Sequence, residues 1–125
     1  MPIILVVDDD PEIRSTLKKL LELSGHEIFT AESGLAAIDS LKHIQVDLMI
    51  TDIVMPDQDG LECMKLARQA NPDLPIIAMS GGGQLRTENY LRLAMAFGAD
   101  EVLQKPFDTS SLLEAIKRTL GDLKS

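Results

Sequence analysis

The chain has 125 residues, which is enough for one domain with its own core, so we expect residues 1–125 to form a single domain. The formal net charge of −8 argues against nucleic acid or an anionic membrane as a direct partner, because both need clustered Lys and Arg. One cysteine excludes an internal disulfide and favours a reducing compartment. No apolar run has the length of a membrane span and the first residues lack a signal-peptide pattern, so we expect a cytoplasmic location.

Short apolar runs predict strands that are buried on both faces, as in a parallel sheet. The clearest predicted strands are Ile3–Val7, Val46–Ile50 and Pro75–Met79, and weaker ones lie at His26–Ala31 and Glu101–Leu103. The strict alternation of these runs with helical segments indicates an α/β domain with right-handed crossovers.

Stripes of apolar residues at helical spacing lie between and after these runs. The stripes begin at Ile13, Leu35, Leu61, Leu91 and Leu112. The lone Cys63 falls within the third stripe and is expected to pack in the core.

Several residues at the ends of the predicted helices have the chemistry of caps. Asp10 precedes a proline and is expected to cap the first helix, while Asp108 or Ser110 is expected to cap the last. Gly25 and Gly98 are expected to end helices through left-handed backbone. The residues after Leu120 are expected to fray.

Polar side chains follow the predicted strands, at the edge where open parallel sheets place their ligand sites. Asp8, Asp9 and Asp10 follow the first strand, and Asp52 follows Val46–Ile50. Two further residues complete the set: Ser80, which precedes three glycines, and Lys105. Carboxylates brought this close repel one another unless a cation intervenes, and an all-oxygen ligand set suits Mg²⁺. A carboxylate beside such a metal and a lysine can attack phosphorus and form an aspartyl phosphate.

These residues, in this order and spacing, resemble a response-regulator receiver domain over nearly the whole chain. The motifs that carry the resemblance are Val6-Val7-Asp8-Asp9, Asp52 with Met55-Pro56 and Asp59-Gly60 after it, Ser80, and Lys105-Pro106-Phe107. The resemblance implies a flavodoxin-like, doubly wound five-stranded parallel sheet, (βα)5, with strand order 2-1-3-4-5. It also implies a phosphorylated signalling domain and not an enzyme.

The resemblance assigns the phosphoryl chemistry to three residues. Asp52 is implied to accept the phosphoryl group from a histidine kinase or a histidine phosphotransfer protein. Lys105 is implied to pair with the phosphoryl group, and Ser80 is implied to turn and donate a hydrogen bond to it.

The resemblance also implies a Mg²⁺ site. Asp9 and Asp52 would bind the ion through their side chains, and Val54 would bind it through its backbone carbonyl. Asp8 would act largely through a metal-bound water.

We expect an effector protein to bind a face formed by the fourth helix, the fifth strand and the last helix, that is, residues 85–97, Val102 and the last helix. Many receivers carry Tyr or Phe where this chain has Val102, so the form of the switch is left open. Val54 and Gly82 lack side chains that could orient an attacking water, and slow self-dephosphorylation is expected.

Two other functions are compatible with parts of the sequence. Asp8-Asp9-Asp10 after an apolar strand resembles the Asp-x-Asp signature of haloacid-dehalogenase-type phosphatases, but Glu12 stands where that family has Thr or Val. A receiver that serves only as a scaffold is the second alternative, although the chain carries all the residues of the phosphorylation site.

Overall fold

The computed structural model describes residues 2–53, 60–80, 92, 95, 96, 98–105 and 107–124, with residues 60, 61 and 122–124 described by their backbone. The strands are β1 (Ile3–Val7), β2 (Glu27–Ala31), β3 (Leu48–Asp52), β4 (Ile76–Ser80) and β5 (Glu101–Gln104). The helices are α1 (Pro11–Leu23), α2 (Gly34–His43), α3 (Gly60–Ala70) and α5 (Thr109–Lys124).

All five strands pair in parallel in one sheet of order β2-β1-β3-β4-β5, which confirms the predicted topology. In the register, Val7 lies beside Thr51, Asp52 beside Met79, and Ser80 beside Gln104. The carboxyl ends of β1, β3, β4 and β5 therefore meet at one edge of the sheet. The polar residues of the sequence were predicted to converge at this edge.

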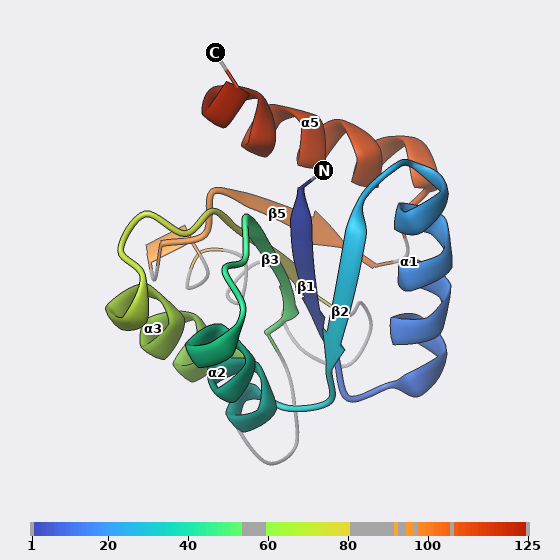
Figure 1. Ribbon diagram of the computed structural model, residues 1–125. Helices are drawn as coiled ribbons and strands as arrows, with labels where there is room; N and C mark the ends of the chain where they lie inside the picture. Colours follow the sequence, from blue (N-terminus) through green and yellow to red (C-terminus); the bar gives the residue numbers. More distant parts are fainter. Residues whose placement is uncertain are drawn as a thin grey trace.

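Helices cover both faces of the sheet (Figure 1). α1 and α5 pack on one face, and α2 and α3 pack on the other, as the two core clusters show. Successive residues of β1 alternate between the clusters, because side chains of a strand point to opposite faces: Ile4 and Val6 join α1 and α5, while Leu5 and Val7 join α2 and α3. The central strands are thus fixed from both sides, and the groups at their ends have a rigid base.

The predicted caps are largely confirmed. The Asp10 side chain accepts a hydrogen bond from the Glu12 N–H at 2.9 Å at the start of α1. Gly25 follows α1 with φ +92° and Gly98 has φ +106°, both in the left-handed region that favours glycine. Asp108 is the residue that caps α5, accepting from the Ser111 N–H at 2.7 Å.

Some of the predicted bounds and one predicted buried position were wrong. β2, β4 and β5 differ from the predicted strands by one residue at one or both ends. The third strand begins at Leu48 and not at Val46, because the Asp47 carboxylate leaves the sheet pattern and accepts a hydrogen bond from the Ile3 N–H at 2.8 Å. Leu35 is 70% exposed, since α2 turns the face with Gly34 and Ala37 to the sheet. α5 continues to Lys124, and Gly121 does not have the positive φ of a helix-ending glycine.

The stripe predicted from Leu91 lies mostly outside the described residues, and within it Met95 is 53% exposed. Cys63 is fully buried on α3, as predicted. Burial raises the pKa of its thiol to about 11, although a hydrogen bond with Thr51 acts in the opposite direction. In the described part of the chain, no helix is long and apolar enough to cross a membrane.

Candidate phosphorylation and metal site

Three charged side chains converge at the carboxyl edge of the sheet. Asp8 directly follows β1, and its N–H donates to the Ala31 carbonyl at 3.1 Å, which continues the pairing with β2. Asp52 is the last residue of β3. Lys105 directly follows β5, and its N–H donates to the Ser80 carbonyl at 2.7 Å. Each functional side chain therefore starts from a backbone position that the sheet itself fixes.

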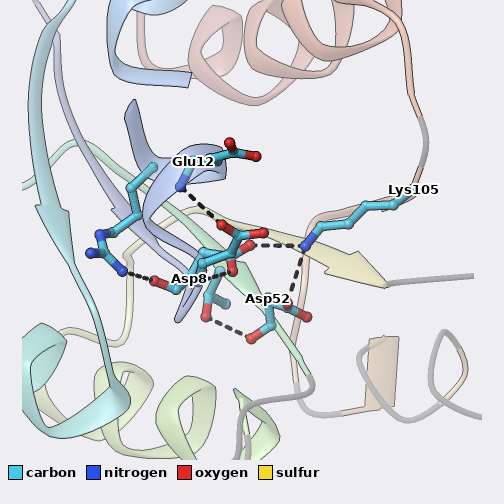
Figure 2. A network of polar contacts seen from close by, with 7 residues as sticks. Asp8, Glu12, Asp52 and Lys105 are labelled. Carbon is cyan, nitrogen blue, oxygen red and sulfur yellow. Dashed lines mark hydrogen bonds and ion pairs between the residues drawn. The ribbon is translucent and has the colours of Figure 1, made fainter. Parts of the chain in front are cut away.

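The Lys105 ammonium bridges the two buried carboxylates (Figure 2). Its Nζ lies 2.8 Å from Asp8 Oδ2 and 3.1 Å from Asp52 Oδ2. Burial opposes the charge on Lys105, but the hydrogen bond to Asp8 and the negative charges of Asp52 and Asp8 outweigh it and raise the pKa of the lysine. Lys105 is therefore charged throughout the physiological pH range.

Asp9 adds a third carboxylate, and it is exposed to solvent. One oxygen from each of Asp8, Asp9 and Asp52 lies within 4.8 Å of the other two. Oxygens that share one octahedral Mg²⁺ at ~2.1 Å lie about 3.0 Å apart in adjacent positions and about 4.2 Å apart in opposite positions, so the three carboxylates lie close enough to surround one ion after side-chain adjustment. Three carboxylates and one ammonium also leave a local charge that a divalent cation neutralises. The residues fit a magnesium ion in both donor type and charge.

The backbone around the two buried carboxylates is held by side chains that sequence reasoning missed. Arg14 Nη1 donates to the Asp8 carbonyl oxygen at 2.7 Å, and the Thr51 hydroxyl donates to the Asp52 carbonyl oxygen at 3.0 Å. Only the position of Arg14 in the sequence, one helical turn after the Asp10 cap, could have suggested such a contact.

Other predicted site residues are placed in part. Ser80 is buried at the end of β4, between the ends of β3 and β5. Val54 and Gly81–Gly83 lie outside the described residues, as does most of residues 85–97. Val102 is half-buried on β5 and packs against the core cluster of α2 and α3.

A groove of about 550 Å³ opens beside the site, between α1 and the start of α5. Its walls are mainly apolar, with two carboxylates and one ammonium among them. The lining residues are Glu12, Ile13, Thr16, Leu17, Leu20, Lys105, Phe107, Asp108, Thr109 and Leu112.

A doubly wound parallel sheet with a lysine-bridged carboxylate cluster at its carboxyl edge defines an α/β domain whose charged groups lie where such sheets place their ligand sites. The family model for the response regulator receiver domain matches residues 4–117, and the chain belongs to this family. It is a two-component receiver domain with an acidic cluster typical of Mg²⁺ sites, a phosphoacceptor signalling domain and not an enzyme in the ordinary sense. The phosphatase alternative was therefore wrong.

Known proteins resemble the chain in sequence and in structure. The transcriptional regulatory protein CpxR of Escherichia coli K12 is 37% identical over 117 residues, which are 94% of this chain and 48% of CpxR. The response regulator TrrA from Thermotoga maritima, crystallised in complex with Mg²⁺-BeF, is 38% identical with a TM-score of 0.84, and the match covers 96% of this chain and all of that chain (100%). A receiver domain protein from Clostridium thermocellum is 31% identical with a TM-score of 0.91, covering 99% of this chain and 98% of that chain. The chain spans about half the length of the curated relatives it matches, such as CpxR.

Proposed function

We propose that Asp52 accepts a phosphoryl group from a phosphohistidine on a histidine kinase or a histidine phosphotransfer protein, in a Mg²⁺-dependent reaction. The single observation that carries the proposal is the Lys105 ammonium, held between Asp8 and Asp52 beside the exposed Asp9 carboxylate. This arrangement prepares a carboxylate nucleophile next to two sources of positive charge, the lysine and a metal site.

Asp52 is better placed than Asp8 to act as the nucleophile. The Asp8 side chain is only 1% exposed, whereas that of Asp52 is 9% exposed and closes the central strand β3. A phosphodonor arriving from solvent therefore reaches Asp52 more easily.

In the proposed reaction, an Asp52 carboxylate oxygen attacks phosphorus as the bond between phosphorus and the donor histidine nitrogen breaks. The histidine leaves with the electron pair of that bond. Asp9, Asp52 and the backbone carbonyl of Val54 would hold Mg²⁺, which would supply positive charge to neutralise the phosphoryl oxygens. Lys105 moves its hydrogen bond from the Asp52 carboxylate to a phosphoryl oxygen, and Ser80 donates a second hydrogen bond to the group.

Phosphorylation adds a charge of about −1.5 to −2 at the ends of β3 and β5. Lys105 and Ser80 both respond to this charge, and the hydrogen bond from the Lys105 N–H to the Ser80 carbonyl links their strands. We propose that the response shifts the face made of residues 85–97, Val102 and α5, where an effector protein binds. The TrrA complex with Mg²⁺-BeF supports this use of the site, because beryllium fluoride bound to an oxygen donor is tetrahedral and resembles a phosphoryl group.

The groove between α1 and α5 is our candidate for docking of the phosphodonor. It opens beside Lys105, its apolar walls suit the apolar face of a helix, and Glu12 and Asp108 suit basic residues on that helix. The reaction partners are proteins in the cytoplasm under this proposal.

The experiment is incubation with Mg²⁺ and acetyl phosphate, followed by intact mass spectrometry. The wild-type chain gains one phosphoryl group and Asp52→Asn gains none, while the control Asp73→Asn, exposed at the opposite edge of the sheet, behaves as wild type. Labelling of Asp52→Asn, or equal labelling of the wild type with EDTA present, would contradict the proposal.

We further propose that the aspartyl phosphate is lost slowly, because Val54 and Gly82 offer no side-chain group to orient water. The test is the decay of the phosphorylated protein compared with the Val54→Asn and Gly82→Glu variants. Decay of the wild type within seconds, or faster than both variants, would overturn this point.

A further inference from the structure

The Arg14 side chain bonds to the backbone carbonyl of Asp8, a member of the carboxylate cluster. Its guanidinium donates to the Asp8 carbonyl oxygen at 2.7 Å, and among the described residues it forms no ion pair. The contact joins the second turn of α1 to the point where β1 ends and the metal-binding loop begins.

The Asp8 carbonyl controls the direction in which the chain continues to Asp9. A peptide unit is planar, so the carbonyl of Asp8 and the N–H of Asp9 belong to one rigid plane. The Asp8 N–H is already fixed by the Ala31 carbonyl at 3.1 Å, and Asp8 Oδ1 is fixed by the Asp10 N–H at 2.9 Å. The bond from Arg14 fixes the remaining freedom of that plane and with it the position from which the Asp9 side chain extends.

This position matters because Asp9 is the exposed member of the carboxylate cluster, without the burial that fixes Asp8 and Asp52. Mg²⁺ requires near-ideal octahedral geometry, so a ligand on a loosely held loop binds it less well. A residue that orients metal ligands from behind typically changes metal affinity by about 10–100-fold when it is removed.

We propose that Arg14 is a positioning residue for the magnesium site, acting through the Asp8 carbonyl and not through its charge. The proposal rests on the function proposed above. Charge and positioning predict opposite results, because a nearby cation by itself repels Mg²⁺ whereas an ordered loop improves its binding.

The experiment measures Mg²⁺ affinity by isothermal titration calorimetry in the wild type, Arg14→Met, Arg14→Lys and Lys18→Met. Lys18 is an exposed cation one turn further along α1, so Lys18→Met removes the same charge without the carbonyl contact. The stability of each variant is measured in EDTA by urea unfolding, and the amide NMR signals of residues 8–10 report the order of the loop.

We expect the Mg²⁺ dissociation constant of Arg14→Met to rise about tenfold, with broadened or shifted signals at residues 8–10. Lys18→Met should leave the constant unchanged or lower it slightly, and Arg14→Lys should recover part of the affinity, since lysine keeps a donor. An unchanged or tighter constant in folded Arg14→Met would overturn the inference, as would equal weakening in Lys18→Met. If the wild type binds no Mg²⁺, the proposed function fails instead.

Discussion

The two edges of the sheet both carry charged side chains, but the charges are balanced differently. At the carboxyl edge, one ammonium serves two buried carboxylates, and Asp9 adds a third negative charge. At the amino edge, two acids each have their own base: Arg68 lies 3.5 Å from Asp100, and Arg118 lies 3.0 Å from Glu101. The carboxyl edge therefore keeps an excess of negative charge, whereas the two ion pairs of the amino edge are neutral.

The charged side chains of the amino edge also form hydrogen bonds with backbone groups. Asp100 Oδ2 accepts from the Ile76 N–H at 2.9 Å, and Arg68 donates to the carbonyl oxygens of Gly98 and Pro72. These bonds hold the start of β4, the start of β5 and the end of α3 together. Ionic contacts thus contribute to stability at one edge, whereas at the other edge the excess of buried carboxylates opposes stability and marks the functional site.

The largest effect expected from this difference follows removal of the shared ammonium. Lys105→Met leaves Asp8 and Asp52 buried without a counter-ion, and we expect a loss of about 2–3 kcal/mol in the free energy of unfolding without Mg²⁺. Excess Mg²⁺ should restore part of the loss, because the metal site lies on the same carboxylates. Urea unfolding with and without Mg²⁺ checks this, with Lys18→Met as the control for an exposed lysine. A loss below about 0.5 kcal/mol would indicate that the pair behaves as a surface salt bridge.

Removal of one acid from each edge should change the free energy of unfolding in opposite directions. Asp9→Ala relieves repulsion and should raise the free energy of unfolding by about 0.5 kcal/mol without Mg²⁺. Asp100→Ala leaves the Ile76 N–H without its acceptor and should lower it by about 1–2 kcal/mol. The measurement is urea unfolding in EDTA.

Addition of Mg²⁺ separates these two variants further. The wild type and Asp100→Ala should gain about 1.4 kcal/mol for each tenfold excess of free Mg²⁺ over the dissociation constant, whereas Asp9→Ala should gain little. Destabilisation of the same size in both variants would remove the distinction between the edges.

Arg68→Met is the matching test for the amino edge. It removes the bonds to Gly98 and Asp100, and we expect a loss of about 1 kcal/mol, since the arginine side chain is partly exposed. Mg²⁺ affinity by calorimetry should stay at the wild-type value. A change in Mg²⁺ affinity would show that the two edges are coupled through β4 and β5.

Sequence alone located the carboxyl edge because strand ends are visible as breaks in apolar runs. Asp8, Asp52 and Lys105 each stand directly at such a break, and parallel pairing brings the breaks together. The order of the strands was implied by the family resemblance, because periodicity does not say which strand lies beside which.

The contacts missed from the sequence act mainly through backbone groups. Arg14, Thr51 and Arg68 bond to carbonyl oxygens whose positions depend on the finished fold, and no spacing rule predicts them. Leu35 was misplaced for a related reason, since the face of α2 that meets the sheet depends on how closely Gly34 and Ala37 approach it.

The smallest expected effect concerns Asp108, which lies just after β5 but outside the carboxylate cluster. Its pKa is lowered from the ordinary 3.8 by the backbone and side-chain hydrogen bonds of Ser111. Because the pKa of Asp108 is lower in the folded state, the cap stabilises the fold at pH values above the pKa of the unfolded state. This contribution is lost as the pH falls through the pKa of the folded state.

Asp108→Asn keeps a capping side chain that does not titrate, so we expect near wild-type stability at pH 7 and a shallower decline below pH 4. Urea unfolding at several pH values between 7 and 3 measures this decline. Parallel declines in the two proteins would show that Asp108 does not carry its own pH dependence, and an increase in stability on Asp108→Asn at pH 7 would place it within the repulsive cluster. Asp108, an exposed acid with one partner, should therefore behave like the paired acids of the amino edge. Burial and a shared counter-ion create the excess charge of the site, and location at the carboxyl edge alone does not.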